Sequence, residues 1–273
     1  MAEKFDGLGL YFSELKDDLL CIPPRFDPGL VSGLTASLGL RSGGFFFENY
    51  PRTSAMDTGE QTLRTVFLVD GFNLYHSLES ALKLMPGVPL KWLDLPRLLT
   101  ETLPLVGPLA RFAAVHYFSA YAYHLHATRP DKIARHKAYV RALTASGVRE
   151  HIGKFQTRDV WCHSCRGYIN AHEEKETDVA LACLLLELAA RDALDVAVVV
   201  SGDSDLAPAV RTFQALYPGK RVLFAFPFDR MNNELGRLAP GSFTLSKETY
   251  AKHQFPEQVR LPSGKFVTKP SEW

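Results

Sequence analysis

The chain has 273 residues, of which 46% are hydrophobic and 22% are charged, and this is ordinary for a soluble globular protein with a full core. The length suits one medium domain with extensions or two small domains. The net charge of +1 argues against a general nucleic-acid binder, because a nucleic acid would have to be held by a local basic patch.

Neither a membrane segment nor a secretion signal is expected. The longest apolar stretch, residues 179–190, is too short to span a bilayer and contains Glu187. The first residues, Met-Ala-Glu-Lys-Phe-Asp, lack the basic and then apolar order of a signal peptide. We therefore expect a cytoplasmic protein with no membrane partner.

The two ends of the chain differ from its middle. Residues 1–60 are rich in Gly, Ser and Pro without sustained periodicity, which predicts a poorly ordered extension with one short helix near 12–20. Because Met56 lies just ahead of the first convincing strand, one hypothesis is that translation begins there. Residues 253–273 are polar and contain proline, so we expect a tail without a core of its own. The predicted domain is 61–252.

Within that domain, apolar runs alternate with helical patterns. Strands are predicted at 65–70, 111–119, 147–155, 196–200, 221–226 and 243–245. Helices are predicted at 73–83, 92–103, 130–146, 177–191, 205–216 and 232–238. This alternation is typical of βαβ units and predicts an α/β fold with a mostly parallel sheet of five to six strands.

Four aspartates fall at equivalent places in this pattern. Asp70 ends the first strand, and Asp203 and Asp205 follow the unbroken apolar run at 196–200. Asp178 lies where the long apolar helix begins. Neighbouring parallel strands place their carboxyl ends side by side, so Asp70 and Asp203 can meet at one edge. Crowded carboxylates raise one another's pKa unless a cation is present, and the cluster therefore predicts a hard divalent cation such as Mg²⁺.

Each aspartate also has a purely structural explanation. Asp205 or Ser204 would serve as the cap of the following helix, and Asp178 or Thr177 as the cap of the long helix. Asp70 before a glycine would be turn chemistry alone. Four such residues on one predicted edge are harder to explain as caps, and this favours a functional site.

The chain resembles the NYN domain family, a branch of the PIN-like nucleases, over roughly residues 64–250. The resemblance is carried by three motifs: Val-Asp70-Gly-Phe-Asn73, Glu174-Lys-Glu-Thr-Asp178-Val-Ala-Leu-Ala and Ser201-Gly-Asp203-Ser-Asp205. It implies a Rossmann-like three-layer sandwich with strand order 3-2-1-4-5 and metal-dependent cleavage of RNA. Carried over by motif, the catalytic and metal-binding carboxylates are Asp70, Asp178, Asp203 and Asp205, with Asn73 beside them.

Two positions depart from the family pattern. NYN domains usually have glycine where this chain has Glu176, and often a glycine or another small residue at Ser204. Glu176 adds a charge near the expected site, as a ligand or as a bystander.

The implied chemistry is hydrolysis of a phosphodiester by water that one or two Mg²⁺ or Mn²⁺ ions activate. Asn73 is expected to supply a neutral oxygen ligand or to hold a substrate phosphate. Lys175 is a candidate phosphate contact, with simple solvation as its alternative. Tyr121, with Tyr123 and His124, is a candidate for stacking on unpaired bases, with packing as the alternative. Five residues would supply a local basic surface or only a solvated face: Lys132, Arg135, Lys154, Arg158 and Arg166.

The cysteines do not suggest a disulfide scaffold. Cys162 and Cys165 have the spacing of a zinc knuckle without a second cysteine pair, so a structural Zn²⁺ competes with reduced thiols in a loop. Nearby histidines would complete such a site if the loop folds back, or two chains would share an ion in a homodimer. Cys183 lies in the apolar helix and is expected to pack in the core.

The sequence thus favours a metal-dependent endoribonuclease acting on RNA. The main alternative is a non-catalytic NYN module that binds RNA or a protein in a regulatory role. A phosphatase or nucleotide hydrolase is less favoured, since there is no Walker-type glycine loop and no Asp-x-Asp after the first strand.

Overall fold

The computed structural model of the chain describes residues 62–162 and 167–273. The chain divides into two units, Met1–Met56 and Asp57–Trp273, and all described residues belong to the second. The helix expected near 12–20 lies outside the described residues.

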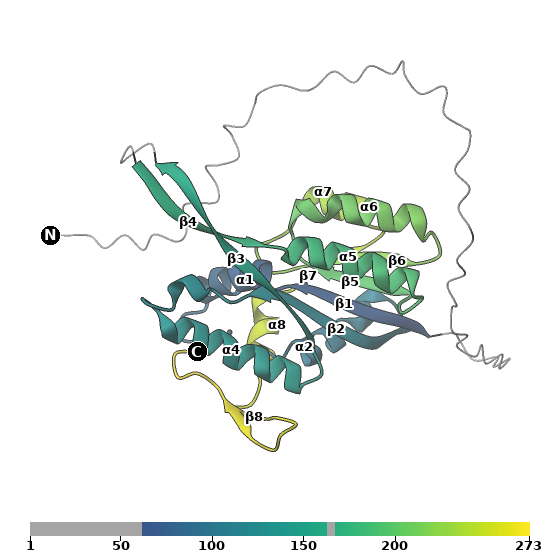
Figure 1. Ribbon diagram of the computed structural model, residues 1–273. Helices are drawn as coiled ribbons and strands as arrows, with labels where there is room; N and C mark the ends of the chain where they lie inside the picture. Colours follow the sequence, from purple (N-terminus) through teal and green to yellow (C-terminus); the bar gives the residue numbers. More distant parts are fainter. Residues whose placement is uncertain (1–61, 163–166) are drawn as a thin grey trace, which may run out of the picture. The chain divides into compact units, whose positions relative to one another are not determined.

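The centre of the domain is a seven-stranded sheet in the order β4-β3-β2-β1-β5-β6-β7 (Figure 1). Its strands are β1 (Leu63–Asp70), β2 (Ala110–Ala120), β3 (Arg149–Cys162), β4 (Gly167–Lys175), β5 (Val196–Val200), β6 (Arg221–Phe226) and β7 (Ser242–Thr244). All neighbours pair in parallel except β3 and β4. The five strands β3-β2-β1-β5-β6 have the predicted 3-2-1-4-5 order, so the α/β prediction is confirmed.

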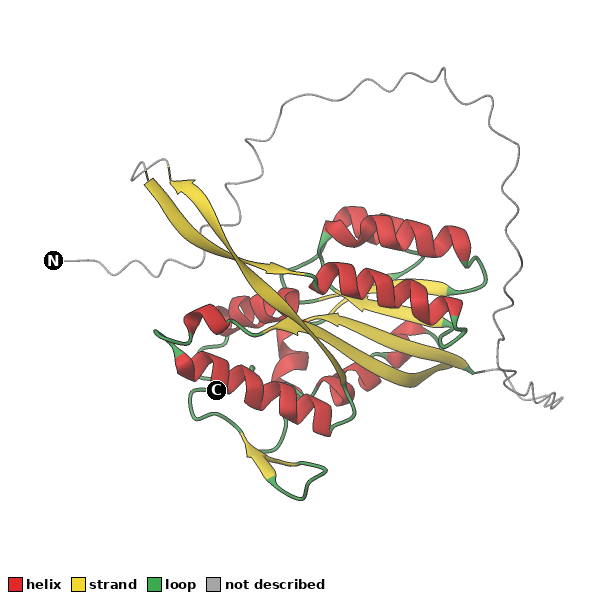
Figure 2. Ribbon diagram, in the orientation of Figure 1, coloured by secondary structure: helices red, strands yellow, loops and turns green. Residues whose placement is uncertain are grey.

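Helices cover both faces of this sheet and make three layers (Figure 2). They are α1 (Gly71–Leu84), α2 (Leu95–Glu101), α3 (Leu103–Val106), α4 (Pro130–Ala145), α5 (Thr177–Ala190), α6 (Ala207–Leu216), α7 (Asn233–Leu238) and α8 (Lys247–Lys252), with 3₁₀ turns η1 (Tyr123–Leu125) and η2 (Ser204–Leu206). Every residue of β5 is buried, as the unbroken apolar run predicted, because this strand is covered on both faces.

Two helix predictions needed correction. The helix expected at 92–103 is two short helices, and Pro104, which has no N–H to donate, sits in the first turn of the second. Cys183 is exposed and not packed in the core. Although α5 is apolar on most sides, only one face of it, including Leu181 and Leu185, is buried against the sheet.

The largest difference from prediction is the hairpin of β3 and β4, which extends away from the rest of the sheet (Figure 1). The strand expected to end near Phe155 continues to Cys162, and residues 167–175, expected as part of an insert, pair with it. Since this pairing raises the strand number above six, the predicted sheet was too small. The sequence of the hairpin has no strong alternation of apolar and polar residues, and the sequence pattern therefore did not predict it.

Residues 253–273 are integrated into the domain. They form the small hairpin of β8 (Gln258–Arg260) and β9 (Phe266–Thr268). Phe255 and Val267 are buried in the core, and the Trp92 indole lies 6.3 Å from that of Trp273. The expected boundary at residue 252 therefore does not separate a tail from the domain.

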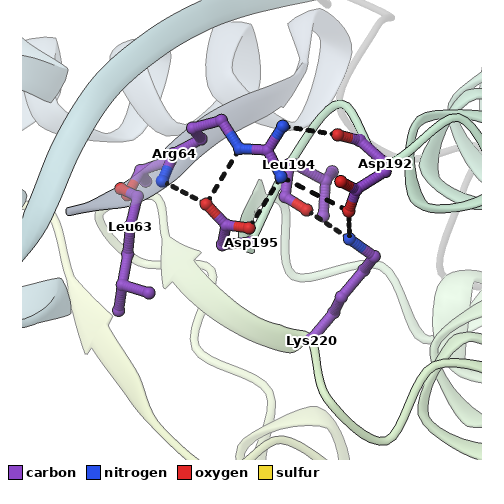
Figure 3. A network of polar contacts seen from close by, with 7 residues as sticks. Leu63, Arg64, Asp192, Leu194, Asp195 and Lys220 are labelled. Atoms are coloured by element: carbon purple, nitrogen blue, oxygen red, sulfur yellow. Dashed lines mark hydrogen bonds and ion pairs between the residues drawn. The ribbon is translucent and has the colours of Figure 1, made fainter. Parts of the chain in front are cut away.

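Charged residues near the amino ends of β1, β5 and β6 form an ion-pair network (Figure 3). Arg64 Nη2 lies 2.8 Å from Asp195 Oδ1, and its Nε donates to Asp195 Oδ2 at 3.0 Å. Lys220 pairs with Asp192 and also donates to the carbonyl of Leu194. In the described parts of the chain, no helix is long and apolar enough to cross a membrane.

Candidate active site

The carboxyl edge of β1 and β5 brings Asp70 and the 201–205 segment together. The two strands are direct neighbours in parallel register, with Val69 opposite Val200. Asp70 is buried and caps α1, because its Oδ1 accepts hydrogen bonds from the backbone N–H groups of Phe72 and Asn73, each at 3.0 Å. Asp70 was expected to serve turn chemistry alone if it were structural, but it caps a helix, and its second carboxylate oxygen accepts a hydrogen bond from the neighbouring strand end.

Ser201 links Asp70 to Asp203. Its hydroxyl donates to Asp70 Oδ2 at 2.8 Å and accepts from the backbone N–H of Asp203 at 3.1 Å. Asp203 Oδ1 in turn accepts from the backbone N–H of Asp205 at 3.0 Å, so Asp203 caps η2. These bonds fix the loop after β5 against the end of β1 and aim two carboxylates at the same edge.

Asn73 has a positioning role that the sequence did not reveal. Its Oδ1 accepts from the backbone N–H of Gly202 at 3.0 Å, so this oxygen holds the loop after β5. Within the described residues, its amide nitrogen donates no hydrogen bond. A glycine is required at 202, because a Cβ there would collide with the carbonyl oxygen of Arg230.

Asp178 differs from the other aspartates because no structural role accounts for it. It lies in the first turn of α5, but the backbone N–H of Thr177 is capped by Glu174 Oε1 at 3.1 Å, so neither Asp178 nor Thr177 is the cap. Its carboxylate forms no hydrogen bond or ion pair with any residue that the structure describes. A half-buried carboxylate without a partner is unfavourable for the folded protein.

The pKa values show how the carboxylates crowd one another. Burial, followed by the charges of neighbouring carboxylates, raises the pKa of Asp178 to about 7. Those neighbours are Asp70, Asp203, Glu174 and Asp205. Burial is also the main cause that raises the pKa of Asp70, and its hydrogen bonds only partly oppose it. The prediction that Asp70, Asp178, Asp203 and Asp205 come together at one edge is consistent with this mutual effect.

The NYN domain model matches residues 64–246, which is more than half of the chain.

The chain belongs to the NYN domain family.

Two solved structures show a weaker likeness. A protein of unknown function from Vibrio parahaemolyticus is 16% identical with a TM-score of 0.47, covering 70% of this chain and 97% of the other. MurG of Acinetobacter baumannii is 11% identical with a TM-score of 0.31, covering 71% of this chain and 43% of the other. At these TM-scores neither likeness says anything further about function. Among curated proteins, no match was found.

The NYN domain belongs to the PIN-like nuclease superfamily, which supports a nuclease kind of function for this chain. The structure shows the backbone and contacts of Glu176 and the position of Ser204, the two residues that depart from the family pattern. Glu176 has φ 82°, the left-handed region that favours glycine, and its carboxylate lies 2.6 Å from Lys154 Nζ. Ser204 begins η2 behind the capping Asp203.

The donors at this edge of the NYN domain suit a hard cation, since they are carboxylate oxygens whose charges repel one another. No group of three or more His, Cys, Asp or Glu side chains is arranged to hold a metal ion within residues 62–162 and 167–273. Mg²⁺ keeps several waters and is usually bound through one or two carboxylates, so the residues present fit a hydrated ion and not an all-protein cage. Which of the four aspartates contact it directly stays a prediction.

The other predicted residues lie around this edge. The Lys175 ammonium is 3.0 Å from the Glu173 carboxylate, so this charge is compensated locally. Tyr121 lines a cavity beside the site. The expected basic surface is also largely neutralised: Arg135 pairs with Asp131 and Glu272, Lys154 with Glu176, and Arg158 with Glu173. The side chain of Cys162, and all of Cys165 and Arg166, lie outside the described residues.

Several residues of the site were missed from sequence. The positioning role of Ser201 was missed, although its place in the third motif, directly after a buried strand, was the available signal. Asn232 donates to the carbonyl of Gly202 at 3.1 Å and also caps α7. The sequence around Arg230 did not indicate a place at this site, because only the approach of its loop to Gly202 brings it there. Its Nε is buried without a hydrogen-bond partner among the described residues.

Proposed function

We propose that this NYN domain is a metal-dependent endoribonuclease that hydrolyses RNA phosphodiesters at the edge formed by Asp70, Asp178, Asp203 and Asp205, in the cytoplasm. The observation that carries the proposal is Asp178, a half-buried carboxylate without a partner among the described residues and with a pKa raised to about 7 by burial and its neighbours. Such an arrangement lowers stability unless a ligand uses it, and perturbed carboxylates in clusters are typical of functional sites.

When bound, Mg²⁺ or Mn²⁺ lowers the pKa of water and neutralises negative charge on the phosphate and the leaving oxygen. The residues of the chain would hold and orient the reactants. Asp70 is fixed by Ser201 and by two backbone N–H groups, which leaves it no freedom to turn away. Asp178 and Asp203 would share the ion's water shell, and the Asn73 amide nitrogen would donate to a phosphate oxygen.

The alternative is a non-catalytic module that binds RNA or a protein in a regulatory role. A binder of RNA gains nothing from crowded carboxylates, because they repel phosphate. None of the four aspartates forms an ion pair with a described lysine, arginine or histidine. The uncompensated charge at this edge therefore favours the enzyme over the binder.

Cleavage of labelled RNA and DNA oligonucleotides tests the proposal. We expect cleavage of RNA with Mg²⁺ or Mn²⁺ and none with EDTA. Asp203→Asn and Asp178→Asn should each lower the rate by about 10²-fold or more. Asp195→Asn is the matched control, since it makes the same change at the opposite edge of the sheet and should leave the rate unchanged.

The binder alternative predicts a different result. Wild-type protein would bind RNA in EDTA but cleave no substrate with either metal. Equal rates for wild type and both active-edge variants would instead mean that the activity has another source, and would remove this site from the proposal.

A further inference from the structure

A cavity of about 330 Å³ lies between the loop after β2 and the β3–β4 hairpin. Rings and one lysine dominate its lining, which includes Tyr121, Tyr123, His124, Lys154, Phe155 and His172. Its volume is at the low end of the range of roughly 300–1,000 Å³ for small-molecule sites. The cavity therefore suits a ligand the size of one nucleoside and is far too small for a duplex.

The rings of the lining leave aromatic surface open to solvent. Tyr123 is 56% exposed, and His172 is also exposed. The His124 and His172 rings stack at 4.1 Å between centroids, and the His124 ring meets the edge of Phe155 at 4.8 Å. This preformed set of ring faces offers a stacking surface for another flat ring.

Packing contacts connect the lining of the cavity to the acidic edge. Phe155 packs against Phe72 at 5.8 Å, and the backbone N–H of Phe72 donates to Asp70. On the other side, a Cβ added at Gly153 would lie 2.8 Å from the Lys175 carbonyl oxygen and 3.1 Å from Thr177 Cγ2. The absence of a side chain at Gly153 thus lets the hairpin lie against the start of α5, one residue before Asp178.

Two cations border the cavity. The Lys137 ammonium lies 4.9 Å from the centre of the Tyr123 ring and 5.6 Å from that of Tyr121. Lys154 contributes to the lining and lies 2.6 Å from Glu176. Aromatic faces with ammonium groups at their border match a nucleotide, which has a flat base attached to an anionic phosphate.

We propose that this cavity binds one unstacked base of a single-stranded RNA, next to the phosphate that is cleaved at the acidic edge. The proposal rests on the proposed function and specifies its substrate class. A base inside the cavity has to be unpaired, so the enzyme would select single strands or loops over duplex RNA. The β3–β4 hairpin would supply half of the base-binding surface.

Fluorescence anisotropy in EDTA, where no cleavage takes place, tests binding separately from catalysis. Wild-type protein should bind a fluorescein-labelled single-stranded RNA more tightly than the same sequence in a duplex. Because one base–aromatic stack contributes about 1–3 kcal/mol, Tyr123→Ala or His172→Ala should weaken single-strand binding by roughly 5- to 150-fold. Tyr123→Phe keeps the ring and should keep the affinity. Phe266→Ala, which removes an exposed ring on the β8–β9 hairpin, is the control.

With Mg²⁺, Tyr123→Ala and His172→Ala should raise KM for single-stranded RNA and leave kcat within a few fold, since neither side chain touches the reacting phosphate. Equal affinity of wild type for both RNA forms, no RNA binding by wild type, or no effect of Tyr123→Ala would each overturn the base site. The proposed nuclease activity would still be supported in these cases if wild-type protein cleaves RNA. Conversely, selective binding in EDTA without any cleavage would keep the base site and remove the enzyme. If each variant unfolds at the same temperature as wild type, misfolding is excluded as the cause of weaker binding.

Discussion

The two ends of β1 and β5 carry the same residue type in opposite electrostatic conditions. At the amino ends, the hydrogen bond from Arg64 is the main cause that lowers the pKa of Asp195 (Figure 3). At the edge formed by the carboxyl ends, burial and neighbouring carboxylates raise the pKa of Asp178, in the first turn of α5, to about 7. Among the described residues, four aspartates without an ion pair lie at one edge, and two aspartates paired with an arginine and a lysine lie at the other.

The difference indicates what each edge contributes. A compensated edge holds the strand ends together and makes folding more favourable. Uncompensated carboxylates at an edge make folding less favourable, although Asp70 and Asp203 also cap α1 and η2. A ligand of opposite charge is the simplest explanation for them. The three predictions below test this contrast.

Divalent metal should stabilise the protein only through the carboxyl edge. At a concentration 100 times its dissociation constant, an ion that binds the folded state adds about 2.7 kcal/mol. We therefore expect Mg²⁺ or Mn²⁺ to raise the thermal unfolding midpoint of wild type by about 5–10 °C over EDTA. Asp178→Asn should lose most of this shift and Asp195→Asn should retain it. A shift of the same size in both variants would place the ion elsewhere.

The metal-free protein should show opposite pH effects at the two edges. The Asp178 carboxyl is neutral in both states below its ordinary pKa of 3.8, and it stays neutral only in the folded state up to about 7. Its contribution to stability is therefore full at low pH and is lost as the pH rises from about 4 to 7. After allowance for solvent screening, we expect a loss on the order of 1–2 kcal/mol, which Asp178→Asn should abolish.

Asp195 should behave in the reverse way. Since its pKa is lowered in the folded protein, its contribution is present above the ordinary value of 3.8 and is lost as the pH falls through the folded value. At neutral pH, Asp195→Asn should cost about 1 kcal/mol. Urea unfolding in EDTA between pH 3 and 8 measures both effects, and parallel pH curves for the two variants would contradict the contrast.

Glu176 gives the smallest effect. Its left-handed backbone costs roughly 1–2 kcal/mol for a residue with a Cβ. Glu176→Gly should remove this strain and, after the entropy that glycine loses on folding, raise the free energy of unfolding by about 0.5–1 kcal/mol. Glu176→Ala also removes the pair with Lys154 but keeps the Cβ, so it separates strain from charge. If urea unfolding gives both variants the same stability, backbone strain at Glu176 is not the cause.

Much of this protein could be predicted locally. The apolar run at 196–200 is a fully buried strand, and the aspartates that follow it lie at a turn, because such patterns depend on a few consecutive residues. The parallel sheet followed from the alternation of strands and helices, whereas its central strand order followed from the resemblance to the NYN family. Asp70 was located correctly at the end of β1 for the same reason.

The tertiary structure decided the burial of these residues and the charges and hydrogen-bond partners beside them. Asp70 meets Ser201, and Arg64 meets Asp195, across 131 residues of chain in both cases. The sequence around each aspartate does not show whether a serine, an arginine or another carboxylate will lie beside it. Burial and charge compensation depend on contacts between distant strands. In the described residues, these contacts compensate the aspartates at one edge of the sheet and leave those at the other without an ion pair.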